Sequence, residues 1–169
     1  GLLENIEASA FEKIIELNLL SAAYCTKAAL PEIKKNHGSI IFISSLAGIR
    51  GLPNNAPYCA AKMALTSLSQ SLGIELANEK VHIGLLRVGL VKNPPGKKVL
   101  NEKGKRIDIH RGGDQTTKQV AGEVSKMIRQ RRKVRNLTLL GKSYNFVNRI
   151  CPLLIELIIV KTRKSERYQ

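Results

Sequence analysis

Tryptophan is absent from this sequence of 169 residues, which holds only four tyrosines and three phenylalanines. So few aromatic side chains, with no base-stacking motif, argue against a nucleic-acid-binding protein. We find no apolar run long enough to span a bilayer and no signal peptide. The methionines are Met63 and Met127 alone and the sequence opens on Gly1, so we expect the natural chain to have residues before it.

Cysteine is also scarce, with three residues and no Cys-x-x-Cys pair. Three cysteines, an odd number with no such pair, predict neither a disulfide framework nor a zinc site. The three histidines show no metal-ligand spacing, so we predict no metal. Free thiols suit a reducing compartment, and we expect a cytoplasmic protein that is either wholly soluble or peripheral to a membrane.

Acidic residues are few in one part of the chain only. Residues 1–91 carry eight cations against seven acids, a net charge of +1, whereas residues 92–169 carry twenty against six, a net charge of +14. The basic part ends in an apolar stretch, Tyr144 to Val160, that is interrupted at Pro152 and followed by further cations. This stretch suits an amphipathic helix on an anionic surface, closure of a substrate pocket, or packing on a partner subunit. A solvated basic face is the simplest alternative.

The N-terminal part predicts a long helix. Ser9 and Glu12 fit a capping box, with which such a helix would begin. Apolar residues then recur at steps of three and four and predict one buried stripe, which includes the polar Asn18. A buried amide is costly unless it finds partners, so Asn18 should bond to the backbone or to ordered water. The members of the stripe are Phe11, Ile15, Asn18, Ala22, Cys25, Ala29 and Ile33.

Strands and helices alternate after this helix. Residues 38–45 and 81–88 predict buried parallel strands, and the intervening helix runs from about Pro57 to Ala77. Such a β-α-β unit is right-handed. Thr117 to Gln130 predicts another helix with four inward residues, and a last short strand is expected from Leu137 to Leu140. Those four residues are Val120, Val124, Met127 and Ile128.

Tyr58 and Lys62 lie four residues apart on the predicted helix and therefore share one face. An ammonium beside a phenol favours its ionised form, which would bring proton exchange closer to neutral pH. Ser45 closes the preceding strand and lies within the sequence Ser-Ser-Leu-Ala-Gly. Together with Asn18, these residues and the Tyr-x-x-x-Lys spacing resemble the active-site tetrad of the short-chain dehydrogenase/reductase family.

This resemblance implies an α/β fold, a Rossmann-like doubly wound parallel sheet, and hydride transfer between NAD or NADP and an alcohol/carbonyl substrate. It gives Tyr58 the role of general acid/base, Ser45 that of holding the substrate oxygen, and Asn18 a water in a proton relay to Lys62. Lys62 would lower the pKa of Tyr58 and bond the nicotinamide ribose. The family's nicotinamide-contacting turn falls at Gly89, Val91 and Asn93, with Val88 replacing its proline and Asn93 its threonine.

The resemblance also divides the chain, which we interpret as one partial domain. Residues 1–91 hold the tetrad, residues 92–116 correspond to the variable substrate loop with a candidate hinge at Gly112–Gly113, and residues 117–169 form the basic C-terminal part. In this family the helices that carry the Asn and the Tyr commonly pack against a second subunit, so we expect a homo-oligomer.

The family's Gly-x-x-x-Gly-x-Gly turn, which lets a pyrophosphate approach a helix N-terminus, does not occur in these 169 residues. The sequence therefore corresponds to strands 5, 6 and 7 of the family fold, an incomplete sheet with flanking helices. Strand 5 would have an open edge, so we expect poor solubility or a partner. A cofactor-less remnant that acts by binding or assembly, at an anionic membrane surface for example, is the alternative to an oxidoreductase.

Overall fold

A computed structural model describes residues 1–92, 96–108 and 112–166. Its centre is a parallel sheet of three strands in the order β1-β2-β5, namely β1 (Ser39–Ser45), β2 (His82–Val88) and β5 (Val134–Asn136). β1 and β2 pair along their whole length, from Ser39 opposite His82 to Ser45 opposite Val88. Within the described residues β1 is an edge strand, which agrees with the open edge predicted for strand 5.

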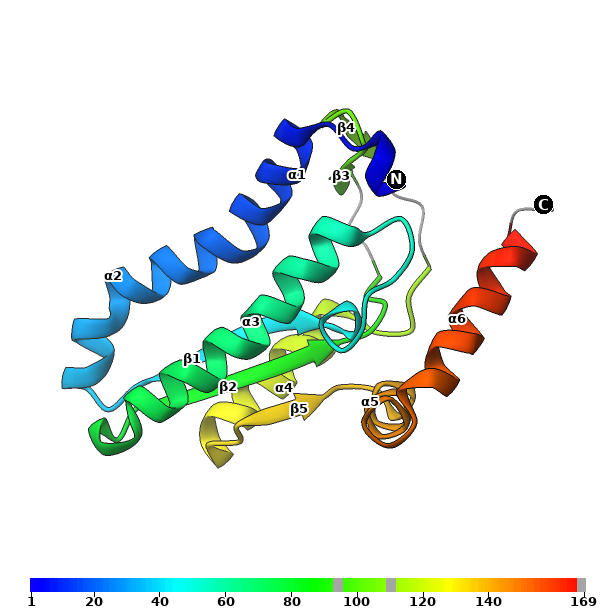
Figure 1. Cartoon of the computed structure of the whole chain (residues 1–169). Helices are drawn as coiled ribbons and strands as arrows, with labels where there is room; N and C mark the ends of the chain where they lie inside the picture. The colour runs from blue at the N-terminus through cyan, green and yellow to red at the C-terminus, as the bar shows by residue number, and fades with distance from the viewer. Residues whose placement is uncertain (93–95, 109–111, 167–169) are drawn as a thin grey trace.

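Helices cover both faces of this sheet (Figure 1). Leu85 of β2 packs with Leu65 of α3 (Ala56–Glu75) on one face, whereas Gly84 faces Met127 of α4 (Thr117–Gln130) on the other. Period-2 alternation along a strand produces this division. Both faces of β2 are covered, and six of its seven residues are buried. The predicted α/β fold with an incomplete parallel sheet is confirmed.

The N-terminal helix contains a π-helical turn that the sequence did not predict. It runs through α1 (Ala8–Ile15), the π turn η2 (Glu16–Leu20) and α2 (Ser21–Lys35), after a short 3-10 turn η1 (Leu3–Asn5). The N–H of Ser21 donates to the carbonyl of Glu16, five residues earlier. A π turn holds one more residue than an α turn, so it rotates the helix face that follows.

This rotation corrects the predicted buried stripe. Cys25 and Ala29 are exposed, and the core is contacted by Leu19 within the turn and by Ala22, Thr26 and Leu30 after it. The predicted capping box is also wrong. Glu7 is the N-cap, and the helix begins at Ala8, so Ser9 and Glu12 already lie inside it. Pro31 lies inside α2, which ends at Lys35 with His37 in the left-handed region, at φ 49°.

The segment after β2 has more structure of its own than the sequence suggested. β3 (Lys98–Leu100) and β4 (Arg106–Asp108) pair as an antiparallel hairpin within the predicted substrate loop. α4 has the predicted bounds and begins with a capping box of Thr116 and Gln119. Val120, Val124 and Met127 are half-buried or buried as expected, but Ile128 is exposed.

The last strand lies three residues before its predicted place. β5 ends at Asn136, and the Leu139–Leu140 pair opens helix α5 (Leu139–Ile150) instead. The Thr138 hydroxyl accepts a hydrogen bond from the Gly141 N–H at 2.9 Å, and this N-cap starts the helix where the sequence predicted a strand. α6 (Pro152–Glu166) follows after the predicted break at Pro152. Across the described residues, no helix has both the length and the apolar character needed to cross a membrane.

The basic run after α4 is partly neutralised by an internal ion pair. Arg135 Nε lies 2.7 Å from Glu123 Oε1, and both side chains are mostly buried. The pair joins β5 to α4 on the face opposite α3. Arg135 is therefore a structural residue, whereas Arg131, Arg132 and Lys133 are exposed.

Candidate active site

Tyr58 and Lys62 lie in the first two turns of α3. The Lys62 Nζ is 5.6 Å from the centroid of the Tyr58 ring, within the range of a cation–π contact. Both side chains are half-buried. Pro57 in the first helical turn fixes the start of α3, because its ring presets the helical φ and the missing N–H is not needed there.

Lys62 is attached to β1 by both its backbone and its side chain. Its Nζ donates to the Ile43 carbonyl at 3.2 Å, and its own carbonyl accepts a hydrogen bond from the Ser44 hydroxyl at 3.0 Å. Burial lowers the pKa of Lys62 below its usual value. The amine is thus held at a fixed place beside the Tyr58 ring, and it loses its proton more readily than an exposed lysine does.

The two adjacent serines have different roles. Ser44 is 1% exposed, and its hydroxyl is used for the contact with α3. Ser45 is half-buried at the end of β1, where its hydroxyl oxygen accepts from the Ala47 N–H at 3.3 Å and begins the 3-10 turn η3 (Leu46–Gly48). Because that bond uses the oxygen as an acceptor, the Ser45 O–H is still a donor.

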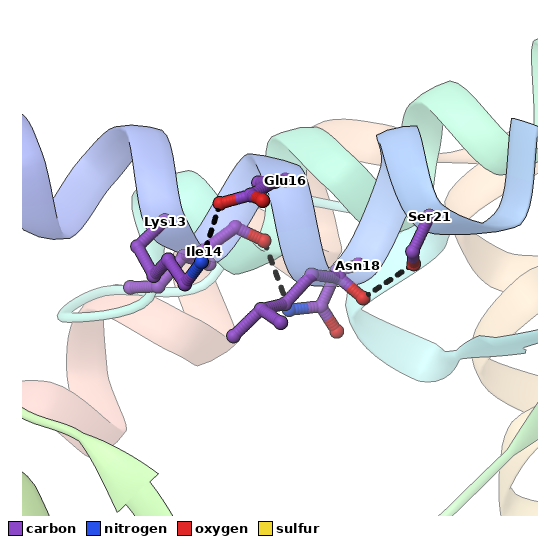
Figure 2. A network of polar contacts seen from close by, with 6 residues as sticks. Lys13, Ile14, Glu16, Asn18 and Ser21 are labelled. Carbon is purple, nitrogen blue, oxygen red and sulfur yellow. Dashed lines mark hydrogen bonds and ion pairs between the residues drawn. The ribbon is translucent and has the colours of Figure 1, made fainter. Parts of the chain in front are cut away.

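Asn18 lies in the π turn. Its Nδ2 donates to the Ile14 carbonyl at 3.0 Å, as Figure 2 shows. That carbonyl is the acceptor which the backbone N–H of residue 18 would use in a regular α-helix. The expectation that the Asn18 amide bonds to the backbone is therefore confirmed. On either side of it, Figure 2 shows an ion pair between Lys13 and Glu16 and a bond from Ser21 to the Leu17 carbonyl.

Helix α3, which carries Tyr58 and Lys62, also contacts the elements that carry Asn18 and Ser45. The π turn with Asn18 packs against α3, and so does η3, which follows Ser45. Figure 1 shows α1 and α3 running side by side on one face of the sheet. The structure thus brings the three elements that carry Asn18, Ser45, Tyr58 and Lys62 into contact, because η2 and β1 both pack against α3.

The turn after β2 carries the remaining predicted residues. The Gly89 N–H donates to Gln115 Oε1 at 3.0 Å, and Val91 forms a parallel bridge with Gln115. Asn93 lies outside the described residues. A Cβ on Gly113 would be 2.6 Å from the Val91 carbonyl carbon, so this glycine allows two backbones to touch, which the hinge interpretation did not anticipate.

Two residues of this region were not singled out from the sequence. Gln115 is 7% exposed and ties the turn after β2 to the start of α4, and Arg50 binds Asn148 of α5 and Glu156 of α6. Both act across distances of 26 residues or more along the chain. A lone Gln or Arg in a loop carries no periodicity, so only the fold could reveal them.

Comparison with known proteins places the chain in a family. The family model described as short chain dehydrogenase matches residues 1–104. This chain belongs to the short-chain dehydrogenase family. Its resemblance to bovine dehydrogenase/reductase SDR family member 4 is 36% identity over 93 residues, which cover 54% of this chain and 33% of that protein. The chain thus spans about a third of the length of this relative.

Solved structures show the same fold for this short-chain dehydrogenase chain. A short-chain dehydrogenase from Streptomyces avermitilis matches with a TM-score of 0.70 and 20% identity, over 100% of this chain and 66% of that one. A structure described as ElxO with NADP bound matches with a TM-score of 0.65 and 23% identity, over 81% of this chain and 60% of that one.

Proposed function

We propose that this chain carries the catalytic half of an NAD(P)-dependent oxidoreductase that interconverts an alcohol and a carbonyl compound. The observation that supports this most directly is the Lys62 amine, fixed by β1 at 5.6 Å from the Tyr58 ring centroid. Family membership and the NADP named for one structural neighbour support it further.

Tyr58 would hold the proton that is given to the carbonyl oxygen during reduction. A positioned acid of this kind contributes a rate factor of about 10² to 10⁴. The Ser45 O–H, still a donor after its oxygen accepts from Ala47, would hold the same substrate oxygen. Lys62 would orient the phenol and favour its ionised form. Asn18 would hold a water in a proton relay that leads to Lys62.

The residues present fit the nicotinamide end of the cofactor. Lys62 and the backbone of Gly89 and Val91 would hold it, and the described backbone at Gly113 comes close enough to Val91 to fix that turn. Bound nicotinamide would supply the hydride. The pyrophosphate cradle has no counterpart in these 169 residues, so NAD and NADP are equally compatible with them.

The experiment is a pair of matched tyrosine variants in the natural polypeptide, whose intact mass and N-terminal sequence are measured first. Tyr58→Phe should lower turnover of a carbonyl panel by about 10²- to 10⁴-fold with either reduced nicotinamide, because the ring stays and the proton is lost. Tyr24→Phe is the control, since Tyr24 is 65% exposed on α2 and the change keeps the aromatic ring that a second subunit would contact. Equal turnover of the Tyr58 variant and the parent would refute the assignment.

A remnant that works by binding or assembly is the second candidate. The absence of a Gly-x-x-x-Gly-x-Gly turn from these residues favours it. Titration of the natural polypeptide with NADH and NADPH separates the two candidates. Binding of either favours the oxidoreductase, and binding of neither favours the remnant.

We also propose a homo-oligomer through the outer faces of α2 and α3. Tyr24 on α2 and Met63 on α3 are 65% and 44% exposed, and the small residues Ala60 and Ser67 beside Met63 would permit close helix approach. Met63→Glu should lower the sedimentation coefficient of the assembly. The matched control is Ile128→Glu, because the Ile128 side chain on α4 is 43% exposed in the parent protein. This control should leave the sedimentation coefficient unchanged.

A further inference from the structure

The two C-terminal helices expose more large apolar side chains than any other part of the described chain. Leu139 is 79% exposed, Phe146 64% and Leu153 71%. Contiguous apolar patches of this kind mark interaction surfaces, because soluble proteins otherwise bury such groups. The exposed apolar residues of α5 and α6 are Leu139, Leu140, Phe146, Ile150, Leu153, Leu154, Leu157, Ile158 and Val160.

On α5 these side chains form one stripe. Leu139, Phe146 and Ile150 are spaced by seven and four residues, which places them on one face of the helix. Lys142 and Arg149, also seven residues apart, border this stripe and are exposed. The opposite side of α5 is fixed inward by Gly141, where a Cβ would be 2.8 Å from the Leu46 side chain.

On α6 the outer face has the same composition. Leu153, Leu157 and Val160 share it, with the exposed Lys161 beside them. The inner side is anchored by the buried Ile155 and by Glu156, which forms an ion pair with Arg50. Figure 1 shows α6 on the side of the molecule away from α2.

The charge of this surface has one sign. Glu156 is the single acid between residues 139 and 162, and its carboxylate is paired with Arg50. Lys142, Arg149 and Lys161 are exposed and belong to no ion pair in the described part of the chain. The outward faces of α5 and α6, which we call the C-terminal face, therefore combine apolar residues with unneutralised positive charge.

We propose that the C-terminal face docks on a bilayer surface that contains anionic phospholipid. Apolar side chains that enter the headgroup region and cations at its level are the two contributions that bind an amphipathic helix to such a surface. A second copy of the chain is a poorer occupant, because it would bring the same cations against each other with no acid to pair them. The proposal is independent of the oxidoreductase assignment.

The test is flotation of the natural polypeptide with vesicles of phosphatidylcholine alone and of equimolar phosphatidylcholine and phosphatidylserine. We expect binding to the second kind and its weakening by salt, since screening reduces attraction between exposed charges. Replacing Lys142, Arg149 and Lys161 with Gln should lower the partition coefficient by roughly a hundredfold at low salt, at about fivefold per cation. Replacing the exposed Lys103, Lys105 and Lys118 with Gln changes the net charge equally and should have little effect.

A second pair of variants tests the apolar contribution. Phe146→Ser with Leu157→Ser should lower the partition coefficient by about tenfold or more. Ile74→Ser with Ile128→Ser removes exposed apolar side chains from α3 and α4 and should leave it unchanged. Circular dichroism checks that each variant is folded.

Three outcomes would overturn the proposal: no binding of the parent to phosphatidylserine vesicles, equal losses in the face variants and their controls, or self-association that the Phe146/Leu157 variant abolishes. In the third case the C-terminal face would be a subunit interface. Sedimentation of the same samples without vesicles distinguishes that case.

Discussion

Gly48 is the position where a single methyl group should damage this fold most directly. A Cβ at this buried residue would be 2.4 Å from the Ser44 hydroxyl oxygen and 2.7 Å from the Lys62 carbonyl oxygen. The second of these is helix backbone, which cannot move aside as the end of a flexible side chain can. Gly48→Ala must therefore push η3 away from α3 and break the 3.0 Å bond between Ser44 and Lys62.

The expected cost has two parts. Overpacking of a buried site costs about 1–3 kcal/mol. A buried hydroxyl left without a partner costs about 1–3 kcal/mol more, and Ser44 is 1% exposed. A loss of roughly 2–6 kcal/mol should lower the Tm by roughly 4–24 °C, at about 2–4 °C per kcal/mol for a chain of this size.

Gly73 is the matched control on α3 itself. No heavy atom lies within 4 Å of a Cβ built there, so Gly73→Ala should raise stability by about 0.5–1 kcal/mol through helix propensity alone. Thermal melts and urea titrations at one protein concentration measure both variants. A Gly48→Ala protein that melts with the parent, or a shift of the same sign for both variants, would refute the packing argument.

Three further predictions concern elements around the sheet. Burial lowers the pKa of His82, whose Nε2–H donates to the Arg132 carbonyl at 2.9 Å. The unfolded chain therefore takes up the proton first, and the stability measured by urea titration should fall as the pH drops below about 6.5. His82→Asn should flatten this dependence of stability on pH, and an unchanged slope would contradict the reasoning. Thr138→Ala should cost about 0.5–2 kcal/mol in thermal melts by removing the α5 N-cap, whereas the exposed Thr117→Ala should cost less; equal costs would count against the cap. Glu123→Gln should cost about 1–3 kcal/mol in urea because it leaves Arg135 uncompensated, and Glu75→Gln, an exposed acid, serves as its control; an equally stable Glu123→Gln protein would contradict the ion pair's role.

The sheet was predictable because its signals are local and strong. Residues 39–45 and 82–88 are apolar runs of strand length, and the helix between them leaves only a parallel pairing. Tyr58 and Lys62 were noticed by their spacing and Ser45 by the resemblance to the family's tetrad, and the structure brings their elements together. Their catalytic roles stay predictions.

The features that the sequence did not predict depend on signals that are not periodic. The π turn at Glu16–Leu20 changed the phase of a stripe that a fixed 3.6 period cannot follow, which exposed Cys25 and Ala29. One side-chain hydrogen bond, from Gly141 to Thr138, decided between strand and helix for Leu139 and Leu140. Gln115 and Arg50 work through long-range bonds, for which a single sequence holds no local signal.

The number of residues in the π turn also determines which face of α2 packs against the sheet. Removing one residue from Glu16–Leu20 would restore a regular α-helix and turn the downstream part by about 100°. Leu19 and Leu30 would then move away from the core and the present outer face, with Tyr24, would rotate toward it. A one-residue deletion here would therefore be more disruptive than most substitutions, and the segment would resist changes in length during evolution even where its side chains vary.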